Sequence, residues 1–185
     1  MIKYFLIFFN LLFFCCNIFA NNIGSDSKFK IPRFVSLKSD NSNLRIGSST
    51  NYPIKLNYIR KNMPLEIVEE NKYWRKINDI EGNIGWIHKT LLQGDRYGII
   101  NNKLNSHLKI FSFPGGKIIG KIGNANIAKL EICMNLWCKI NYNTLEGWVE
   151  KKNIWGVYKN EKFNIPFYQP LFNKMWEFYS YLIKI

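Results

Sequence analysis

The side chains that most often carry chemistry are few in this chain, and their spacing does not assemble a catalytic set. Glycoside hydrolysis needs two carboxylates that face each other across a cleft. The closest acidic pairs instead share predicted turns, Asp79 with Glu81 and Glu69 with Glu70. No Ser-His-Asp, Cys-His or phosphate-loop pattern is present, so we expect a protein that is not an enzyme.

Two cysteines, Cys133 and Cys138, have four residues between them in the stretch EICMNLWCKI. Such a gap would suit half of a metal site, but His88 and His107 lie far away in the sequence. The residues around each cysteine alternate as strands do, so a tight hairpin would bring the two sulfurs together. We therefore predict a disulfide, which is typical of an oxidising compartment, and neither a metal nor another cofactor. A disulfide that closes a loop this small stabilises the folded state by about 2 kcal/mol.

A further group of side chains suits binding better than catalysis. Tyr52, Tyr58, Tyr73 and Trp74 lie near predicted loop and strand ends, and Arg45 lies in a predicted loop. Small barrels can bind an extended chain by laying it on aromatic side chains between loops, and Arg45 is suited to an anionic group. Both kinds of residue also have structural uses, since aromatics fill small cores and Arg45 can donate to loop carbonyls.

These candidates belong to an internal sequence repeat of two copies, with an offset of 62 to 65 residues between them. The matched blocks keep their order, which chance similarity does not easily produce. The blocks are NLRIGSSTNYPIKLNYI over HLKIFSFPGGKIIGKIG, PLEIVEE over KLEICMN, WRKIND over WCKINY, and NIGWIH over EGWVEK. This alignment places Arg45 over Lys109.

Each copy is predicted to form about five short strands, with period-two alternation in stretches such as LEIVEE and with glycine or asparagine at most turns. That pattern is typical of a small antiparallel barrel or sandwich. We predict an all-β fold with two small barrels in tandem, the first over residues 33–94 and the second over residues 95–161.

A Gly-Trp pair closes each copy, Gly85-Trp86 in the first and Gly147-Trp148 in the second. A glycine inside a strand often marks a bend or a close approach of another backbone. We expect each tryptophan to plug the barrel interior, with the next residue on the opposite face. The competing interpretation is that the two indoles are ligand platforms.

As a set, these residues resemble the bacterial SH3 (Src-homology-3-like) family, in the tandem form found in exported proteins of Gram-negative bacteria. The resemblance covers about residues 33–161 and rests on Asn43-x-Arg45-x-Gly47, on WRKI from Trp74, on GNIGWI at 82–87 and on IWGVY at 154–158. It implies SH3-like barrels, and some members of the family are cell-wall targeting modules attached to hydrolases. The second copy lacks the Asn, Arg and Gly of the loop motif, so a mainly structural role is implied for it.

The first 20 residues, MIKYFLIFFNLLFFCCNIFA, are predicted to be a cleaved signal peptide. They combine the basic Lys3, an apolar run and the small residue Ala20. An uncleaved anchor is the alternative, but Asn10 interrupts the run, which is shorter than the roughly 20 residues a span needs. Lipoprotein attachment at Cys15 is a further alternative, disfavoured by the bulky phenylalanines before it.

The chain is strongly basic, with a net charge of +13. An exported basic protein meets anionic lipid headgroups, envelope polymers and peptidoglycan carboxylates. The charges are scattered rather than packed into one stripe, so we do not expect a nucleic-acid partner. The expected location is periplasmic or secreted.

The C-terminal tail, residues 162–185, is predicted to end in an amphipathic helix of three to four turns after Pro166 and Pro170. Its apolar stripe consists of Phe172, Met175, Trp176, Tyr179, Leu182 and Ile183. The tail is too short and too polar to span a membrane. It is expected either to pack on the barrels or to dock on a membrane surface or a partner protein.

Together, these observations predict an exported binding module of the cell envelope that recognises a cell-wall polymer, peptidoglycan, or an envelope protein. The alternative function is that of a structural interaction protein whose C-terminal helix docks on a membrane or a partner.

Overall fold

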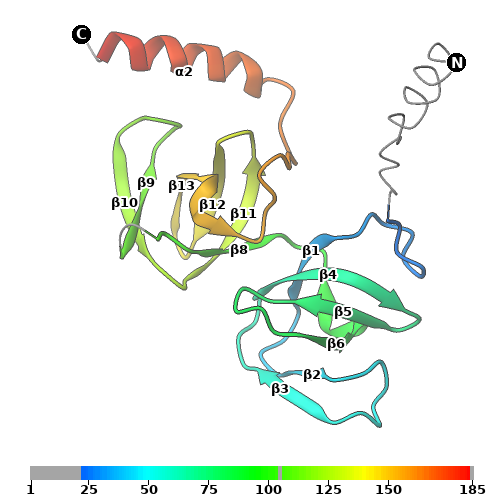
Figure 1. Cartoon of the computed structure of the whole chain (residues 1–185). Helices are drawn as coiled ribbons and strands as arrows, with labels where there is room; N and C mark the ends of the chain where they lie inside the picture. The colour runs from blue at the N-terminus through cyan, green and yellow to red at the C-terminus, as the bar shows by residue number, and fades with distance from the viewer. Residues whose placement is uncertain (1–21, 104–105, 184–185) are drawn as a thin grey trace, which may run out of the picture.

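The computed structural model of the protein describes residues 22–103 and 106–183. The predicted signal peptide at 1–20 lies outside these residues. Two seven-stranded antiparallel sheets follow one another along the chain, and each curls into a small barrel (Figure 1). A helix closes the chain, so the predicted all-β fold of two tandem barrels with a C-terminal helix is confirmed.

Barrel 1 is formed by the first seven strands, with a short 3-10 helix, η1 (Lys89–Leu91), before the last. The strands are β1 (Arg33–Leu37), β2 (Ser42–Arg45), β3 (Ile54–Tyr58), β4 (Pro64–Asn71), β5 (Trp74–Asn78), β6 (Ile84–His88) and β7 (Leu92–Gln93). Their order in the sheet is β3-β2-β6-β5-β4-β1-β7.

Barrel 2 has the same construction, including a 3-10 helix, η2 (Lys151–Asn153), before its last strand. The strands are β8 (Tyr97–Ile100), β9 (His107–Phe111), β10 (Ile118–Gly123), β11 (Ile127–Cys133), β12 (Trp137–Tyr142), β13 (Leu145–Glu150) and β14 (Ile154–Trp155). Their order, β10-β9-β13-β12-β11-β8-β14, repeats that of barrel 1 strand for strand.

Strand pairing gives a more accurate alignment of the two copies than the sequence does. Arg45 pairs with Trp86 in barrel 1, whereas Phe111 pairs with Trp148 in barrel 2. Arg45 therefore corresponds to Phe111, and the predicted match with Lys109 is wrong by two residues. The β2–β3 loop of barrel 1, residues 46–53, is two residues longer than the β9–β10 loop of barrel 2, residues 112–117, so the offset between the copies is 66 before this loop and 64 after it.

Each barrel encloses its own apolar core. The core of barrel 1 consists of Leu37, Leu44, Tyr58, Leu65, Ile67, Ile77 and Ile87. The core of barrel 2 includes Ile100, Leu108, Ile110, Ile122, Leu130, Ile140 and Val149, with the two cysteines and smaller contributors. Alternate residues of each strand supply these side chains, as the period of a strand requires.

The prediction that the two tryptophans plug the barrel interiors is wrong, because neither belongs to the core cluster of its barrel, although Trp148 is buried. Ile87 and Val149 enter the cores instead, so Trp86 and Trp148 point to the outer face of the sheet. The glycines do mark close approaches, as predicted. A Cβ on Gly85 would lie 2.7 Å from the Arg45 carbonyl oxygen, and one on Gly147 would lie 2.8 Å from that of Phe111.

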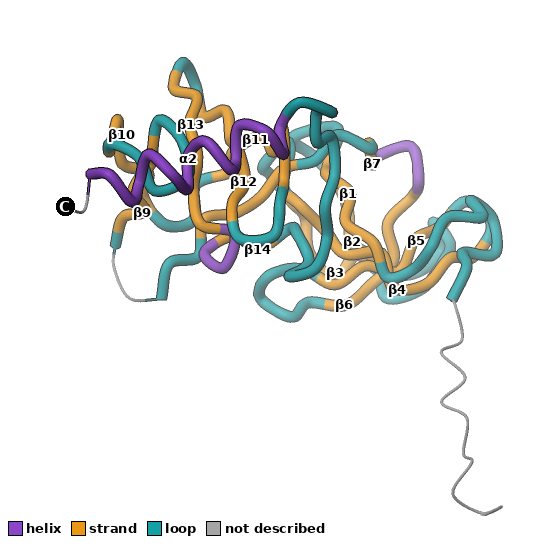
Figure 2. Tube along the Cα trace, turned by 90° about the horizontal axis from the view of Figure 1, so that it is seen from above, coloured by secondary structure: helices purple, strands orange, loops and turns teal. Residues whose placement is uncertain are grey.

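The helix α2 (Gln169–Ile183) confirms the predicted C-terminal helix. Pro170 stands in its first turn, where the missing N–H costs nothing. Two views at right angles place α2 alongside barrel 2 (Figures 1 and 2). Within the described residues, no helix has the length and apolar character needed to cross a membrane.

The two barrels touch through the segment that follows β14. The Tyr158 hydroxyl donates to Glu66 of β4 over 2.8 Å, and the Tyr158 ring lies 4.7 Å from that of Phe34. The Phe34 ring also meets Trp155 edge to face at 5.1 Å. The end of barrel 2 is thus tied back to the first strands of barrel 1.

Candidate functional site

The outer face of barrel 1 gathers aromatic and cationic side chains from three adjacent strands. Directly paired residues of antiparallel strands project from the same side of a sheet. Trp74 pairs with His88, Lys76 pairs with Trp86, and Trp86 pairs in turn with Arg45 of β2. We call this surface, formed by these five residues, the Trp86 face.

The rings of the Trp86 face are arranged around His88 and Lys76. Trp74 meets His88 edge to face with ring centroids 5.4 Å apart, and Tyr73 at the end of the β4–β5 hairpin stacks on the same histidine at 6.2 Å. The Lys76 ammonium lies 5.9 Å from the centroid of Trp86. Trp86 is only half-buried, so its ring remains available to a ligand.

Arg45 has the structural role that we weighed against ligand binding. Its guanidinium donates to the Tyr52 carbonyl oxygen over 2.6 Å and so closes the β2–β3 loop, residues 46–53. The Tyr52 ring is exposed and packs beside Gly47, where a Cβ would come within 2.6 Å of it. Arg45 contributes charge to the Trp86 face, and Tyr52 is linked to that face only through its hydrogen bond with Arg45.

Tyr58 must be removed from the candidate binding residues. It lies in the core of barrel 1, and its hydroxyl donates to Asp79 over 2.9 Å. Burial, together with the negative charge of Asp79, raises the pKa of Tyr58 above its usual value. Asp79 also accepts from the backbone N–H groups of Glu81 and Asn83, so it organises the β5–β6 turn. Tyr73 is exposed and Trp74 half-buried, and both remain candidates.

Barrel 2 carries an equivalent face, but the chain covers it itself. Trp137, Lys139 and Trp148 occupy the register positions of Trp74, Lys76 and Trp86. Trp148 is only 5% exposed, because Trp176 of α2 meets it edge to face at 5.7 Å. Barrel 1 thus leaves its tryptophan half-exposed, whereas barrel 2 covers the corresponding tryptophan with α2.

Sequence reasoning missed a buried ionic cluster centred on Glu70. This residue lies in β4 opposite Arg75 rather than in a turn. Its carboxylate accepts from the Ser27 hydroxyl over 2.6 Å, from the Ser27 N–H over 2.8 Å and from Arg33 over 2.7 Å. Burial alone would raise the pKa of Glu70, but these hydrogen bonds outweigh it and lower the pKa to about 2. The cluster holds the N-terminal segment, 22–30, against barrel 1.

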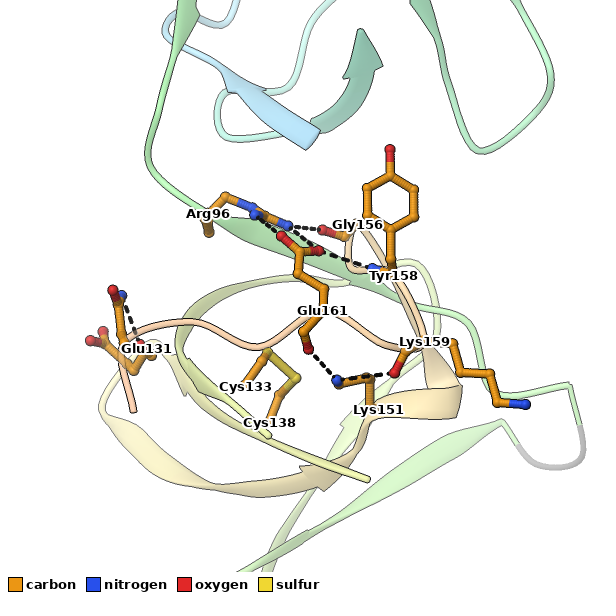
Figure 3. Close-up of a disulfide and its surroundings, with 10 residues drawn as sticks. Arg96, Glu131, Cys133, Cys138, Lys151, Gly156, Tyr158, Lys159 and Glu161 are labelled. Carbon is orange, nitrogen blue, oxygen red and sulfur yellow. Dashed lines mark hydrogen bonds and ion pairs between the residues drawn. A yellow bond between two sulfur atoms is a disulfide. The ribbon is translucent and has the colours of Figure 1, made fainter. Parts of the chain in front are cut away.

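At the corresponding register position, barrel 2 has the predicted disulfide, Cys133–Cys138, which is confirmed with an S–S distance of 2.03 Å (Figure 3). Here the segment after β14 takes the place of the N-terminal segment. Phe163 exchanges two backbone hydrogen bonds with Cys133, each 3.2 Å long. Nearby, Arg96 binds both carboxylate oxygens of Glu161, as Figure 3 shows.

A cavity of about 730 Å³ lies between the barrels and is a less suitable ligand site. Arg33, Arg75 and Arg96 line it, but each already pairs with a carboxylate of the protein. Within residues 22–103 and 106–183, no cluster of three or more His, Cys, Asp or Glu side chains could hold a metal ion.

Two solved structures are similar over part of their length, NlpC1 and NlpC2 from Trichomonas vaginalis, at 15% and 13% sequence identity and TM-scores of 0.28 and 0.31. The matches cover 71% and 74% of this chain but only 48% and 52% of those chains, so this chain spans about half their length. A search of curated proteins found no match.

One family model matches the sequence, and it does so within barrel 1. The match runs over residues 38–94, from the end of β1 to the end of β7, and the family is described as the bacterial SH3 domain. It includes the whole Trp86 face. Residues 38–94 of this chain therefore match the bacterial SH3 domain family.

Proposed function

We propose that the protein is a non-catalytic binding module of the cell envelope, periplasmic or secreted, that recognises peptidoglycan through the Trp86 face of barrel 1. The bacterial SH3 domain and the disulfide both favour an extracytoplasmic, cell-wall-related role. Recognition of an envelope protein by the same face is the alternative.

The observation that carries the proposal is the contrast between the two outer faces. Barrel 2 buries its tryptophan beneath α2, whereas barrel 1 leaves Trp86 half-buried beside Lys76 and Arg45. Flat apolar rings suit the faces of sugar rings, and neighbouring cations suit carboxylates of peptide stems. Peptidoglycan offers both groups in one polymer.

Retention on purified sacculi tests the proposal. We expect the protein to co-sediment with sacculi at low salt and Trp86→Ala to reduce the retained fraction at least fivefold. Lys76→Gln should reduce it less, because an exposed charge pair contributes only about 0.2–1 kcal/mol. The controls are Trp137→Ala and Lys139→Gln in barrel 2, at the positions that correspond to Trp74 and Lys76. Both should retain the wild-type level.

Absence of wild-type retention at low salt would contradict peptidoglycan binding and leave the envelope-protein alternative. Equal losses for Trp86→Ala and Trp137→Ala would place the ligand outside the Trp86 face. Circular dichroism of each variant would show that the barrels remain folded.

A further inference from the structure

Helix α2 leaves several of its described apolar side chains uncovered. It meets barrel 2 along one edge, where Trp176 stacks on Phe113 at 5.8 Å and touches Trp148, and where Gln169 is buried. Three of the apolar residues whose side chains the structure describes face away from this contact. Leu171, Met175 and Phe178 are 73%, 54% and 65% exposed.

These three residues form one stripe along the helix, because positions i, i+4 and i+7 share a face. Two more aromatic side chains extend it, Phe172 at 42% exposed and Phe167, just before the helix, at 94%. A contiguous apolar patch of this kind marks an interaction site rather than ordinary surface.

The part of barrel 2 that carries α2 is unusually basic. From Arg96 to Leu130 the sequence contains six lysines and arginines and no aspartate or glutamate. Three of them, Lys109, Lys117 and Lys121, are exposed on the β9–β10 ribbon, whose turn supplies Phe113 to the helix contact. Ile118 and Ile119 of the same ribbon are also exposed.

We propose that α2 and the β9–β10 ribbon together form a docking surface for an anionic lipid bilayer. The apolar stripe would enter the boundary between headgroups and acyl chains, and the lysines would contact the headgroups. A second copy of the chain fits this surface less well, since pairing would bring two acid-free ribbons together. The membrane contact is independent of the ligand bound by barrel 1.

Vesicle co-sedimentation of the purified protein tests the proposal. We expect at least tenfold more binding to vesicles of phosphatidylglycerol and phosphatidylethanolamine than to phosphatidylcholine vesicles. Binding should fall as salt is raised from about 0.1 M to about 1 M, because screening shortens the reach of the lysines. The triple variant Leu171→Gln, Met175→Gln, Phe178→Gln should lose at least tenfold in partitioning.

Two matched controls distinguish the loss of this docking surface from a general effect of substitution. Leu171→Met, Met175→Leu, Phe178→Leu keeps the stripe apolar and should bind within about twofold of wild type, as volume-conserving apolar swaps are well tolerated. Lys117→Gln with Lys121→Gln should weaken binding severalfold, whereas Lys38→Gln with Lys61→Gln, both exposed in barrel 1, should not.

Two results would overturn the proposal. One is equal binding of the wild type and the glutamine triple variant to anionic vesicles. The other is a concentration-dependent dimer in sedimentation velocity that the same triple variant abolishes, because the stripe would then be a contact between copies. Sacculus retention by the triple variant should stay at the wild-type level, so the two proposals fail separately.

Discussion

Barrels 1 and 2 join the same pair of strand positions in different ways. Glu70 lies opposite Arg75 in barrel 1, and Cys133 lies opposite Cys138 in barrel 2. The ionic pair is buried, with side-chain exposures of 0% and 5%. One barrel therefore holds the ends of two strands together by charge, and the other by a covalent bond.

The two solutions make different demands on the rest of the chain. A disulfide needs no further partner, whereas a buried carboxylate and guanidinium need hydrogen bonds for all their polar atoms. Barrel 1 meets this need with the N-terminal segment, in which Ser27 binds Glu70 and Asp26 binds Arg75 over 2.6 Å. Barrel 1 therefore depends on residues outside its own sheet to bind the polar atoms of its buried ion pair.

The strongest test of this comparison removes the carboxylate. Glu70→Ala should lower the free energy of unfolding of barrel 1 by about 3–5 kcal/mol, because it takes the Glu70 carboxylate away from the buried Arg75 and the half-buried Arg33. Urea denaturation followed by tryptophan fluorescence measures the change. The control is Glu69→Ala, whose exposed ion pair with Lys76 should contribute less than about 1 kcal/mol. Equal losses of stability in Glu70→Ala and Glu69→Ala would show that the buried ion pair contributes no more than the exposed one.

Acid should weaken barrel 1 through the same residue. The pKa of Glu70 is lowered from 4.5 to about 2 in the folded state, so its contribution is complete above pH 4.5 and is lost as pH falls toward 2. Since one pKa unit corresponds to about 1.4 kcal/mol, the loss is at most about 3–4 kcal/mol. Urea titrations between neutral and acidic pH measure it. The pH slope should flatten in Glu70→Gln; an unchanged slope would assign the effect to other groups.

Reduction of the disulfide should have a smaller and separate effect. Opening a loop this short should cost barrel 2 about 2 kcal/mol, because it restores entropy to the unfolded chain. Cys133→Ser with Cys138→Ser, compared with the wild type under reducing and non-reducing conditions, measures the cost. Hydrogen exchange should show the loss in β11 and β12 and leave β4 and β5 unchanged. A loss shared equally by both barrels would mean that they unfold as one unit.

The smallest expected change concerns the cover over Trp148. Trp176→Ala should cost about 0.5–1.5 kcal/mol, the range measured for aromatic pairs. More telling, it should make Trp148 accessible to acrylamide, so that barrel 2 acquires an outer face as open as that of barrel 1. Unchanged quenching relative to the wild type, after allowance for the missing indole, would show that α2 is not what shields this ring.

The strand pattern, the disulfide and the C-terminal helix could all be predicted from the sequence, but the orientation of the Gly-Trp pairs was predicted wrongly. Residues two apart in a strand share a face. If Gly85 marks the crowded inner side, then Ile87 shares that side and Trp86 must lie on the other. The two expectations, a close approach at the glycine and a plug at the tryptophan, were incompatible, and parity alone could have shown it.

The ionic cluster could not be found in this way. Strict alternation after Leu65 and Ile67 would place Glu69 inward and Glu70 in the solvent. A bulge between Ile67 and Glu69 shifts the phase by one residue, so Glu70 is buried instead. The equivalent bulge, between Leu130 and Ile132, turns Cys133 inward. Period-two reasoning has no means of locating such an insertion, and the partners in the N-terminal segment are more than 40 residues away.

The N-terminal segment sets a limit on how the protein can be dissected. Gly24 lies so close to the Glu70 carboxylate that a Cβ would come within 2.4 Å of it, and Ser25 donates to the Glu70 carbonyl oxygen. A fragment that starts at Arg33 would possess every strand of its sheet and still lose these contacts. The smallest autonomous version of the first unit therefore begins near Asn22, and the second must extend to Phe163 to keep its backbone pairing with Cys133.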